Sequence, residues 1–365
     1  MSPVSTKVTI ERVLAHLEAL VAFDTQNPPR DFDAQSPMFA YLAESLGEAF
    51  SVDVTDHGKG RVTFHARRGM PKVLFNVHLD TVPVLDGAAR PPLELIVEDG
   101  RAYGRGACDI KGAAACLLAL AETTDAPMAL LFTTDEEGAE GCCVAEFLAS
   151  GAAAAYSQVV VAEPTECVAQ FRHRGYLSAR GRFVGVGGHS SEPRALDDNA
   201  IHRLVRWSAS AIELARSMAA ERRRSCFNIG TAGGGVKSNV IADHADIFWS
   251  ARLAPGDSND DFLATLSELD GGEHAEWITS FSGPPLPTAG HDDAAARQFA
   301  ALNELPTGDG LDFWTEASLF AAAGLPALVL GPGNIEQAHV VDEWVALEQL
   351  ERACERYGAV VNGDV

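Results

Sequence analysis

Two neighbouring glutamates after an apolar segment carry side chains suited to metal or acid–base chemistry. The run 129–132 predicts a buried strand, and Asp135, Glu136 and Glu137 follow it. Successive side chains of an extended segment point in opposite directions, so Glu136 and Glu137 can serve different partners, one a water molecule and one a metal ion. Because an isolated acidic run more often faces solvent, this interpretation depends on other segments with ligand chemistry.

A histidine and an aspartate two residues apart form the next candidate. His78 and Asp80 follow the apolar run 73–77, so both side chains can point to the same side. A metal-bound histidine usually gives its second N–H to a carboxylate that orients the ring, and Asp80 is placed for that role. Asp109 lies in a glycine-rich stretch directly before a predicted helix, where capping the helix is the alternative role.

Two more candidate ligands follow apolar segments that predict buried strands, Glu163 after 158–162 and His339 after 327–330. Ligands of open α/β sheets gather at the carboxyl ends of the strands, so we expect the candidates to converge. Two histidines and three carboxylates would then meet: His78, Asp109, Glu137, Glu163 and His339. With one bridging carboxylate, each of two metal ions would have a similar nitrogen and oxygen set, which suits zinc, with cobalt or manganese as substitutes.

The order of predicted elements indicates the scaffold that positions these side chains. Apolar strands alternate with helices up to residue 163 and again near the C-terminus, which predicts an α/β fold, a mostly parallel sheet with helices on both faces. Between them, a strand–helix–strand–strand–helix–strand order predicts an inserted two-layer α+β module. We expect a catalytic metal-binding domain of residues 1–173 and 284–365, and an inserted domain of residues 174–283.

Composition disfavours several classes of function. The 365-residue chain has a formal net charge of −23, which would repel nucleic acid and anionic membrane surfaces. No run of about 18 apolar residues predicts a membrane span, and the N-terminal segment lacks the apolar core of a signal peptide. Seven cysteines without CxxC pairs predict neither a disulfide framework nor a zinc ribbon. We therefore expect a cytoplasmic protein with no nucleic-acid or membrane partner.

In combination, these motifs resemble those of the M20 metallopeptidase family, which are hydrolases with two co-catalytic zinc ions. The similarity covers nearly the whole chain, including the inserted module. It implies two divalent metal ions per chain, Zn or Co, with Asp109 bridging them. His78 and Glu163 would complete one metal site, and Glu137 and His339 would complete the other.

The same resemblance implies roles for residues outside the metal ligands. Glu136 would be the general base, and Asp80 would orient the imidazole of His78. A cis peptide bond would join Asp109 to the next residue. The segment 187–193 resembles the family's lid, so His189 would help to hold an oxyanion at the active site of the other subunit of a homodimer. The inserted module would thus serve as a lid and dimerisation domain.

Asn239 and Arg252 resemble family residues that bind the substrate carboxylate, and a guanidinium group suits that task. Similarity is strongest to the acetylornithine deacetylase branch and its relatives acting on N-acetyl-L-citrulline. It implies removal of the acetyl group from a small-molecule N-acetyl-L-amino acid, N-acetyl-L-citrulline in arginine biosynthesis, to give acetate and the free amino acid. N2-acetyl-L-ornithine, succinyl-diaminopimelate and dipeptides are alternative substrates. The presence of Glu136 and all five ligands disfavours a non-catalytic binding protein. A serine hydrolase is also disfavoured, because the sequence has no G-x-S-x-G motif.

Overall fold

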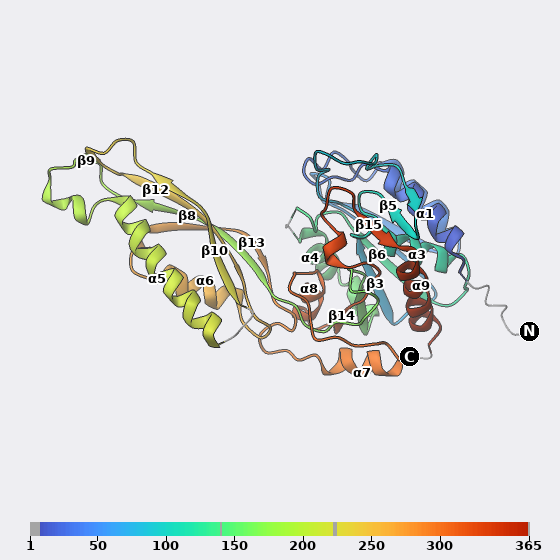
Figure 1. The fold of residues 1–365 in the computed structure, drawn as a ribbon. Coiled ribbons are helices and arrows are strands. Elements are labelled where there is room, and N and C mark those ends of the chain that lie inside the picture. The colour runs from blue at the N-terminus through green and yellow to red at the C-terminus, as the bar shows by residue number, and fades with distance from the viewer. Residues whose placement is uncertain (1–7, 139–140, 222–224, 364–365) are drawn as a thin grey trace, which may run out of the picture. The chain divides into compact units, whose positions relative to one another are not determined.

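The computed structural model describes residues 8–138, 141–221 and 225–363 of the chain. The chain divides into two compact units, one built from residues up to 171, 293–310 and 315 onward, the other from 172–292 and 311–314. Residues 311–314 belong to the second unit because Trp314 packs edge-on against Phe281, with ring centroids 5.0 Å apart, and its Nε1 donates to the Pro284 carbonyl. The two units are coloured by residue number in Figure 1.

A six-stranded sheet forms the centre of the first unit, in the order β1-β2-β6-β3-β7-β14 (Figure 1). Its strands are β1 (Ser51–Asp56), β2 (Val62–Arg68), β3 (Val73–His78), β6 (Met128–Thr133), β7 (Gln158–Val161) and β14 (Ala327–Val329). The pairs β3–β6, β3–β7 and β7–β14 are parallel, whereas β1–β2 and β2–β6 are antiparallel. Strands β3, β6 and β7 are buried along their whole length, as their continuous apolar runs predict. The predicted mainly parallel sheet is confirmed.

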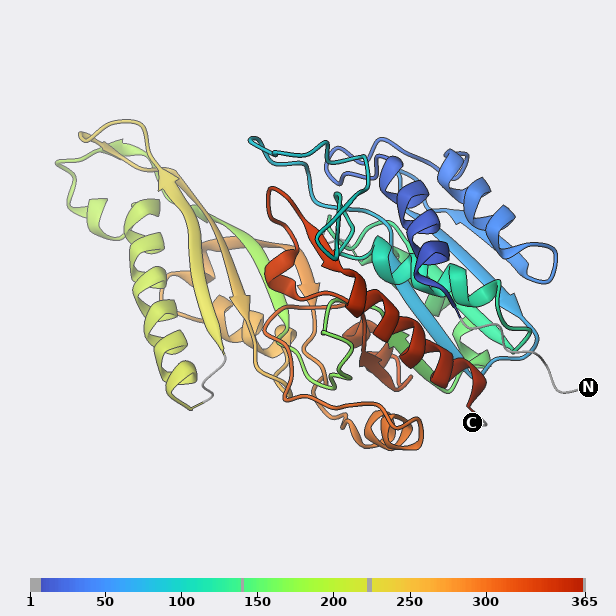
Figure 2. The same cartoon turned by 45° about the vertical axis from the view of Figure 1, so that its right-hand side comes forward.

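Helices flank this sheet, as Figure 2 shows. They are α1 (Ile10–Ala22), α2 (Pro37–Leu46), α3 (Lys111–Ala121), α4 (Cys142–Ala149), α7 (Ala294–Leu302), α8 (Ala317–Ala322) and α9 (Leu347–Asn362). Helix α3 packs against α1, α2, α9 and β3, while α4 and α8 contact each other and strands of the sheet. Every residue of α3 is buried, because its alanine-rich sequence lets neighbouring helices approach closely.

A small second sheet in this unit was not predicted from the sequence. Its order is β15-β5-β4, with strands β4 (Ile96–Glu98), β5 (Arg101–Tyr103) and β15 (Trp344–Ala346). Segments of three residues are too short for a period-two pattern to reveal them. The pairing of β15 with β5 joins parts of the chain that are remote in sequence and places residue 343 beside the loop before α3.

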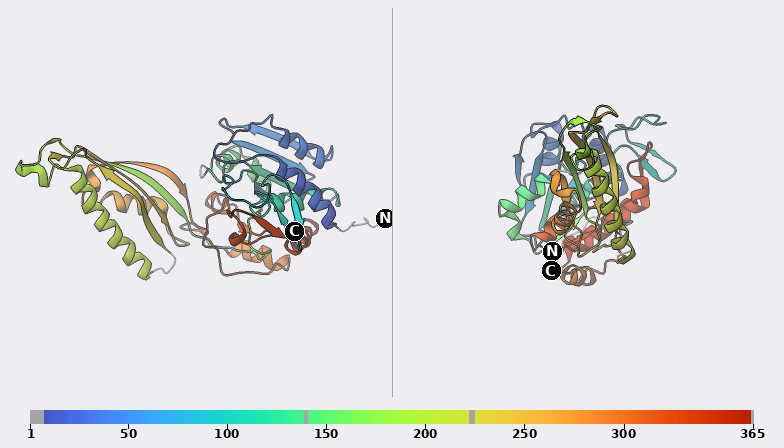
Figure 3. Two further views of the ribbon diagram at one scale, coloured as in Figure 1. Left: turned by 45° about the horizontal axis from the view of Figure 1, so that its top comes forward. Right: turned by 90° about the vertical axis from the view of Figure 1, so that its left-hand side faces the viewer.

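The second unit contains a four-stranded antiparallel sheet in the order β10-β12-β8-β13, with the helices along it (Figure 3). Its elements are β8 (Tyr176–Val184), β10 (Cys226–Gly234), β12 (His244–Arg252), β13 (Ala275–Gly283), α5 (Ala200–Glu221) and α6 (Asn259–Ser267). The core is aromatic: Trp207 of α5 lies 4.9 Å from Trp277 and 6.5 Å from Trp249 between ring centroids. Strand β8 begins at Tyr176, and His173 before it forms an isolated bridge with Leu286.

A two-stranded pair, β9 (Gly188–His189) with β11 (Val240–Ile241), completes the sheets described here. The role of the second unit as a lid or dimerisation domain stays a prediction. Across the described ranges, no helix combines the length and hydropathy needed to cross a membrane. All seven cysteines lie in those ranges, and each is a free thiol.

Candidate active site

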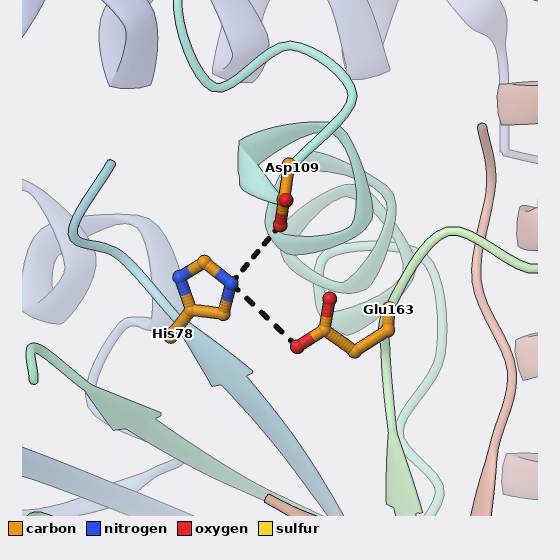
Figure 4. A group of neighbouring side chains, drawn as sticks. All are labelled: His78, Asp109 and Glu163. Carbon is orange, nitrogen blue, oxygen red and sulfur yellow. Dashed lines mark hydrogen bonds and ion pairs between the residues drawn. The ribbon is translucent and has the colours of Figure 1, made fainter. Parts of the chain in front are cut away.

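Three ligand-type side chains converge where β3 and β7 end and α3 begins (Figure 4). His78 is the last residue of β3, Glu163 follows the parallel neighbour β7, and Asp109 precedes the N-cap residue of α3. His78 Nε2 lies 3.1 Å from Asp109 Oδ1 and 3.6 Å from Glu163 Oε1. All three side chains are buried. The topology thus brings one nitrogen and two carboxylates to one point.

A second group uses the other oxygen of Asp109. His339 Nε2 lies 3.0 Å from Asp109 Oδ2 and 3.0 Å from Glu137 Oε1. Glu137 comes from the loop after β6, and His339 comes from the long loop after β14. Within each of these two groups, the potential ligand atoms lie within 4.8 Å of one another. Asp109 therefore offers one oxygen to each group, as a carboxylate that bridges two cations would.

Asp109 lies directly before a helix, as its sequence context predicts, and not at the end of a strand of the six-stranded sheet. It lies in the turn before α3, and the predicted cis peptide bond between Asp109 and Ile110 is present. Three backbone N–H groups of this turn, including that of Asp109, donate to the carboxylate of Glu343, which lies just before β15. The position of the Asp109 side chain between the two ligand groups thus depends on a turn that is held by a residue from a distant part of the sequence.

Asp80 contacts the His78 imidazole chiefly through its own backbone. His78 Nδ1 lies 2.9 Å from the Asp80 carbonyl oxygen and 3.6 Å from Asp80 Oδ1. The carboxylate is held elsewhere, because its Oδ2 accepts hydrogen bonds from Asn27 Nδ2 at 2.8 Å and from the Glu137 N–H at 3.0 Å. Asp80 thus also connects the loops that carry His78 and Glu137.

Glu136 is half-buried and lies beside both groups. Its carboxylate forms a third set of potential ligands with His78 and Glu137, again within 4.8 Å. Burial raises its pKa well above that of an ordinary glutamate, and the nearby carboxylates Glu163, Glu137 and Asp109 add to the rise. Proximity alone does not separate a base from a ligand, so the division of roles between Glu136 and Glu137 stays a prediction.

Concentrated negative charge dominates the electrostatics of the site. Burial, and then the charge of Asp109, raise the pKa of Glu163 well above its usual range. Burial lowers the pKa of His339, but hydrogen bonds to Asp109 and Glu137 outweigh it and raise the pKa to about 11. For Asp109, burial favours the neutral form, yet hydrogen bonds from His339 and His78 leave its pKa below the usual range.

The donor set fits divalent cations. The cluster favours positive charge strongly enough to hold protons on its histidines, and a bound cation would supply that charge while leaving each imidazole neutral as a ligand. Two groups of one imidazole and two carboxylate oxygens each match the nitrogen and oxygen ligands of zinc and of its common substitutes.

The three remaining predicted site residues lie in the second unit. His189 is exposed on β9, its Nδ1 is 2.8 Å from Ser191 Oγ, and its N–H donates to Glu192. Asn239 is exposed just before β11. Arg252 is half-buried at the end of β12, with its guanidinium carbon 4.1 Å from the centre of the Tyr176 ring.

Several buried polar residues around the metal-ligand cluster were missed from the sequence. Asn27 holds Asp80, and Glu316 is a fully buried carboxyl whose pKa burial raises to about 8. Glu316 Oε2 accepts a hydrogen bond from Thr133 Oγ1 at 2.9 Å, at the end of β6. Their partners lie far away in sequence, and a lone Asn or Glu in an irregular segment carries no recognisable pattern.

Comparison with known proteins places the chain in a class. Residues 74–363 match the profile of Peptidase family M20/M25/M40, and the chain belongs to this family, whose members are metal-dependent hydrolases of amide bonds. A curated relative, an N-acetyl-L-citrulline deacetylase from Xanthomonas campestris, is 44% identical over 359 residues, covering 96% of this chain and 97% of that protein. An acetylornithine deacetylase from Proteus mirabilis is 28% identical, covering 98% and 96%.

Solved structures show the same fold at low sequence identity. An aminopeptidase from Bacillus cereus has a TM-score of 0.75 at 18% identity, covering 97% of this chain and 98% of that one. An M20 metallo-carboxypeptidase from Sulfolobus solfataricus has a TM-score of 0.71 at 14% identity, covering 96% and 98%. The predicted family and fold class are therefore confirmed.

Proposed function

We propose that this protein removes the acetyl group from N-acetyl-L-citrulline, giving acetate and L-citrulline within arginine biosynthesis. The observation that carries the hydrolytic part of the proposal is Asp109, each of whose oxygens faces a separate histidine–glutamate pair. The substrate rests on the relative that is 44% identical over nearly the whole chain. A cytoplasmic location is part of the proposal, and the free thiols of all seven cysteines are in keeping with it.

Two divalent ions, zinc or cobalt, are proposed to occupy the cluster. His78, Glu163 and one Asp109 oxygen would hold one ion, and His339, Glu137 and the other Asp109 oxygen would hold the second. When bound, such ions lower the pKa of a water molecule and polarise a carbonyl group. His78, Asp109 and Glu163 are buried, so electrostatic interactions at these ligands are stronger than in water, whereas His339 is exposed.

Glu136 is proposed to move the protons of the reaction. Its carboxylate would accept a proton from the attacking water and then deliver it to the nitrogen of the leaving amine. Burial raises the pKa of Glu136, so it holds a proton more firmly than an exposed carboxylate, which suits such a relay. Asp80 would keep the His78 ring oriented through its carbonyl oxygen, and would align Glu137 through that residue's N–H.

Substrate choice is tested by comparing amides that share the reacting bond. We expect kcat/KM of the metal-loaded protein to be highest for N-acetyl-L-citrulline, lower for N-acetyl-L-ornithine, and lowest for N-succinyl-diaminopimelate and dipeptides. Citrulline ends in a neutral ureido group and ornithine in a shorter cationic amine, so the comparison changes the charge, length and hydrogen-bonding groups at the end of the side chain. The −23 net charge attracts cations only weakly at physiological salt, so contacts must set the preference. A clear preference for N-acetyl-L-ornithine would reverse the assignment.

We propose further that the protein is a homodimer in which His189 stabilises the oxyanion at the active site of the other chain. Asn239 and Arg252 would bind the carboxylate of the substrate. Support for the His189 role comes from the family resemblance and from its exposed imidazole on β9, where His189 follows two glycines. In a two-fold dimer such a contribution would be reciprocal.

Mixing two inactive variants tests this shared site. Glu136→Gln and His189→Ala are expected to be nearly inactive alone but to regain activity when their subunits exchange. Each heterodimer would then hold one doubly damaged site and one intact site, so about a quarter of all sites would be intact after statistical mixing. Subunit exchange is verified separately with differently tagged chains. An inactive mixture despite verified exchange would show that His189 does not act in the other subunit.

A further inference from the structure

A buried glutamate outside the proposed ligand set holds the turn that carries Asp109. Glu343 is 3% exposed and directly precedes β15. Its Oε1 accepts hydrogen bonds from the backbone N–H groups of Cys108 and Asp109, both at 2.9 Å. Its Oε2 accepts one from the Gly106 N–H at 2.9 Å and one from Arg105 Nη1 at 2.6 Å. Four donors from one short segment thus converge on a single carboxylate.

The backbone around Glu343 is itself fixed. The Gly104 N–H donates to the Glu343 carbonyl oxygen at 3.1 Å, and the adjoining strands β5 and β15 pair in antiparallel register. The turn that it grips is closely packed, since a Cβ at Gly106 would lie 2.8 Å from Lys111 Cδ and 2.9 Å from Thr81 Cγ2. Glu343 therefore connects a rigid strand pair to a turn with little room to move.

The same segment of chain carries His339, four residues before Glu343. His339 Nε2 and Asp109 Oδ2 are 3.0 Å apart, so the two loops must keep a fixed relative position for both to bind one ion. Glu343 joins these loops directly, because its side chain holds the backbone of the Asp109 turn while its main chain continues to His339.

Arg105 balances the charge of this carboxylate. The Arg105 and Glu343 side chains are 3% and 2% exposed and form a buried ion pair at 2.6 Å. Arg105 Nη2 also approaches the carbonyl oxygens of Pro83 and Val340, at 3.4 and 3.3 Å. Arg105 therefore offsets part of the cost of burying the Glu343 carboxylate, whose two oxygens accept all four hydrogen bonds.

We propose that Glu343 is a positioning residue of the metal centre. Its carboxylate accepts hydrogen bonds from the backbone of residues 106–109, which keeps Asp109 between the two ligand groups and so increases metal affinity. This inference rests on the metal-binding role proposed above. Residues that orient ligands typically contribute about 10–100-fold to metal affinity. A purely structural role would instead contribute to the stability of the fold and leave affinity unchanged.

Zinc affinity, measured by competition with a chromophoric chelator, separates these two roles. Glu343→Gln keeps the size of the side chain but replaces one acceptor oxygen by an NH2 donor. That donor would face either the Gly106 N–H and Arg105 Nη1, or the N–H groups of Cys108 and Asp109. We expect zinc to bind about 10–100-fold more weakly to this variant. The matched control is Asp342→Asn, because Asp342 is the adjacent acid and accepts N–H groups of Ala89 and Arg90 in a different loop. Its zinc affinity should stay within about twofold.

A second background tests whether Glu343 acts through Asp109. In the Asp109→Asn variant, adding Glu343→Gln should weaken the remaining zinc binding by less than about threefold. If Glu343 acts by positioning Asp109, the effects of the two substitutions on zinc affinity are not additive. Equal losses in both backgrounds, or unchanged affinity with a lowered Tm of the metal-free protein, would overturn the proposal. If Glu343→Gln does not fold, Glu343→Asp carries the same test, because its shorter side chain cannot reach all four donors. An unaltered chain that binds no zinc would instead contradict the metal site itself.

Discussion

Replacing Glu136 by glutamine is expected to lower kcat for hydrolysis of the acetylated amino acid by roughly 10²–10⁴-fold while the metal content stays unchanged. Glutamine preserves the size and polarity of the side chain but cannot accept the proton of the attacking water. The Glu136 carboxylate sits beside both proposed ligand groups without being needed to complete either of them. Activity should therefore fall through kcat, with little change in the metal-to-protein ratio.

Glu137→Gln is the matched control for this experiment. The chemical change is identical and the residue adjacent, but Glu137 Oε1 lies 3.0 Å from His339 Nε2, within the second ligand group. We expect this variant to lose metal, and to lose activity as a consequence. Metal analysis and steady-state kinetics on both proteins separate the two roles. Equal metal loss in both variants, or a Glu136→Gln protein with full activity, would show that the division of roles is wrong.

Three of the five candidate ligands could be predicted because they lie at the carboxyl ends of neighbouring parallel strands. Strands β3, β6 and β7 are consecutive parallel neighbours, so their carboxyl ends meet at one edge of the sheet. Each is a mainly apolar run with a ligand-type residue at or shortly after its end: His78, Glu137 or Glu163. An apolar run that ends in an acid or histidine is visible in a single sequence. Because ligands of open α/β sheets gather at the carboxyl ends of the strands, the convergence of these three could be predicted.

The supporting contacts follow no such rule. The Glu343 carboxylate and the Asp109 N–H that it accepts are 234 residues apart, and the short strands that align them have only three residues each. Asn27, which holds Asp80, lies 53 residues from it in an irregular segment. Such contacts depend on how distant segments of the chain pair in three dimensions, so no local sequence pattern reveals them.

Removal of metal is expected to abolish hydrolysis, and zinc or cobalt should restore it. The reason is that each oxygen of Asp109 faces its own histidine–glutamate pair, and among the described residues the carboxylates of Asp109, Glu136, Glu137 and Glu163 gather around His78 and His339. Without cations these groups can hold protons but cannot lower the pKa of a water molecule to the neutral range. Loss of activity should therefore be complete rather than partial, and reversible when metal returns.

The most direct test is a titration of thoroughly chelated protein with zinc, in which metal content and release of acetate from N-acetyl-L-citrulline are measured on the same samples. We expect no activity at the start and a rise to a plateau at about two ions per chain, the number that a shared bridging carboxylate would support. Full activity in the metal-free protein, or a plateau reached with no metal bound to the chain, would contradict a metal centre at His78, Asp109, Glu137, Glu163 and His339.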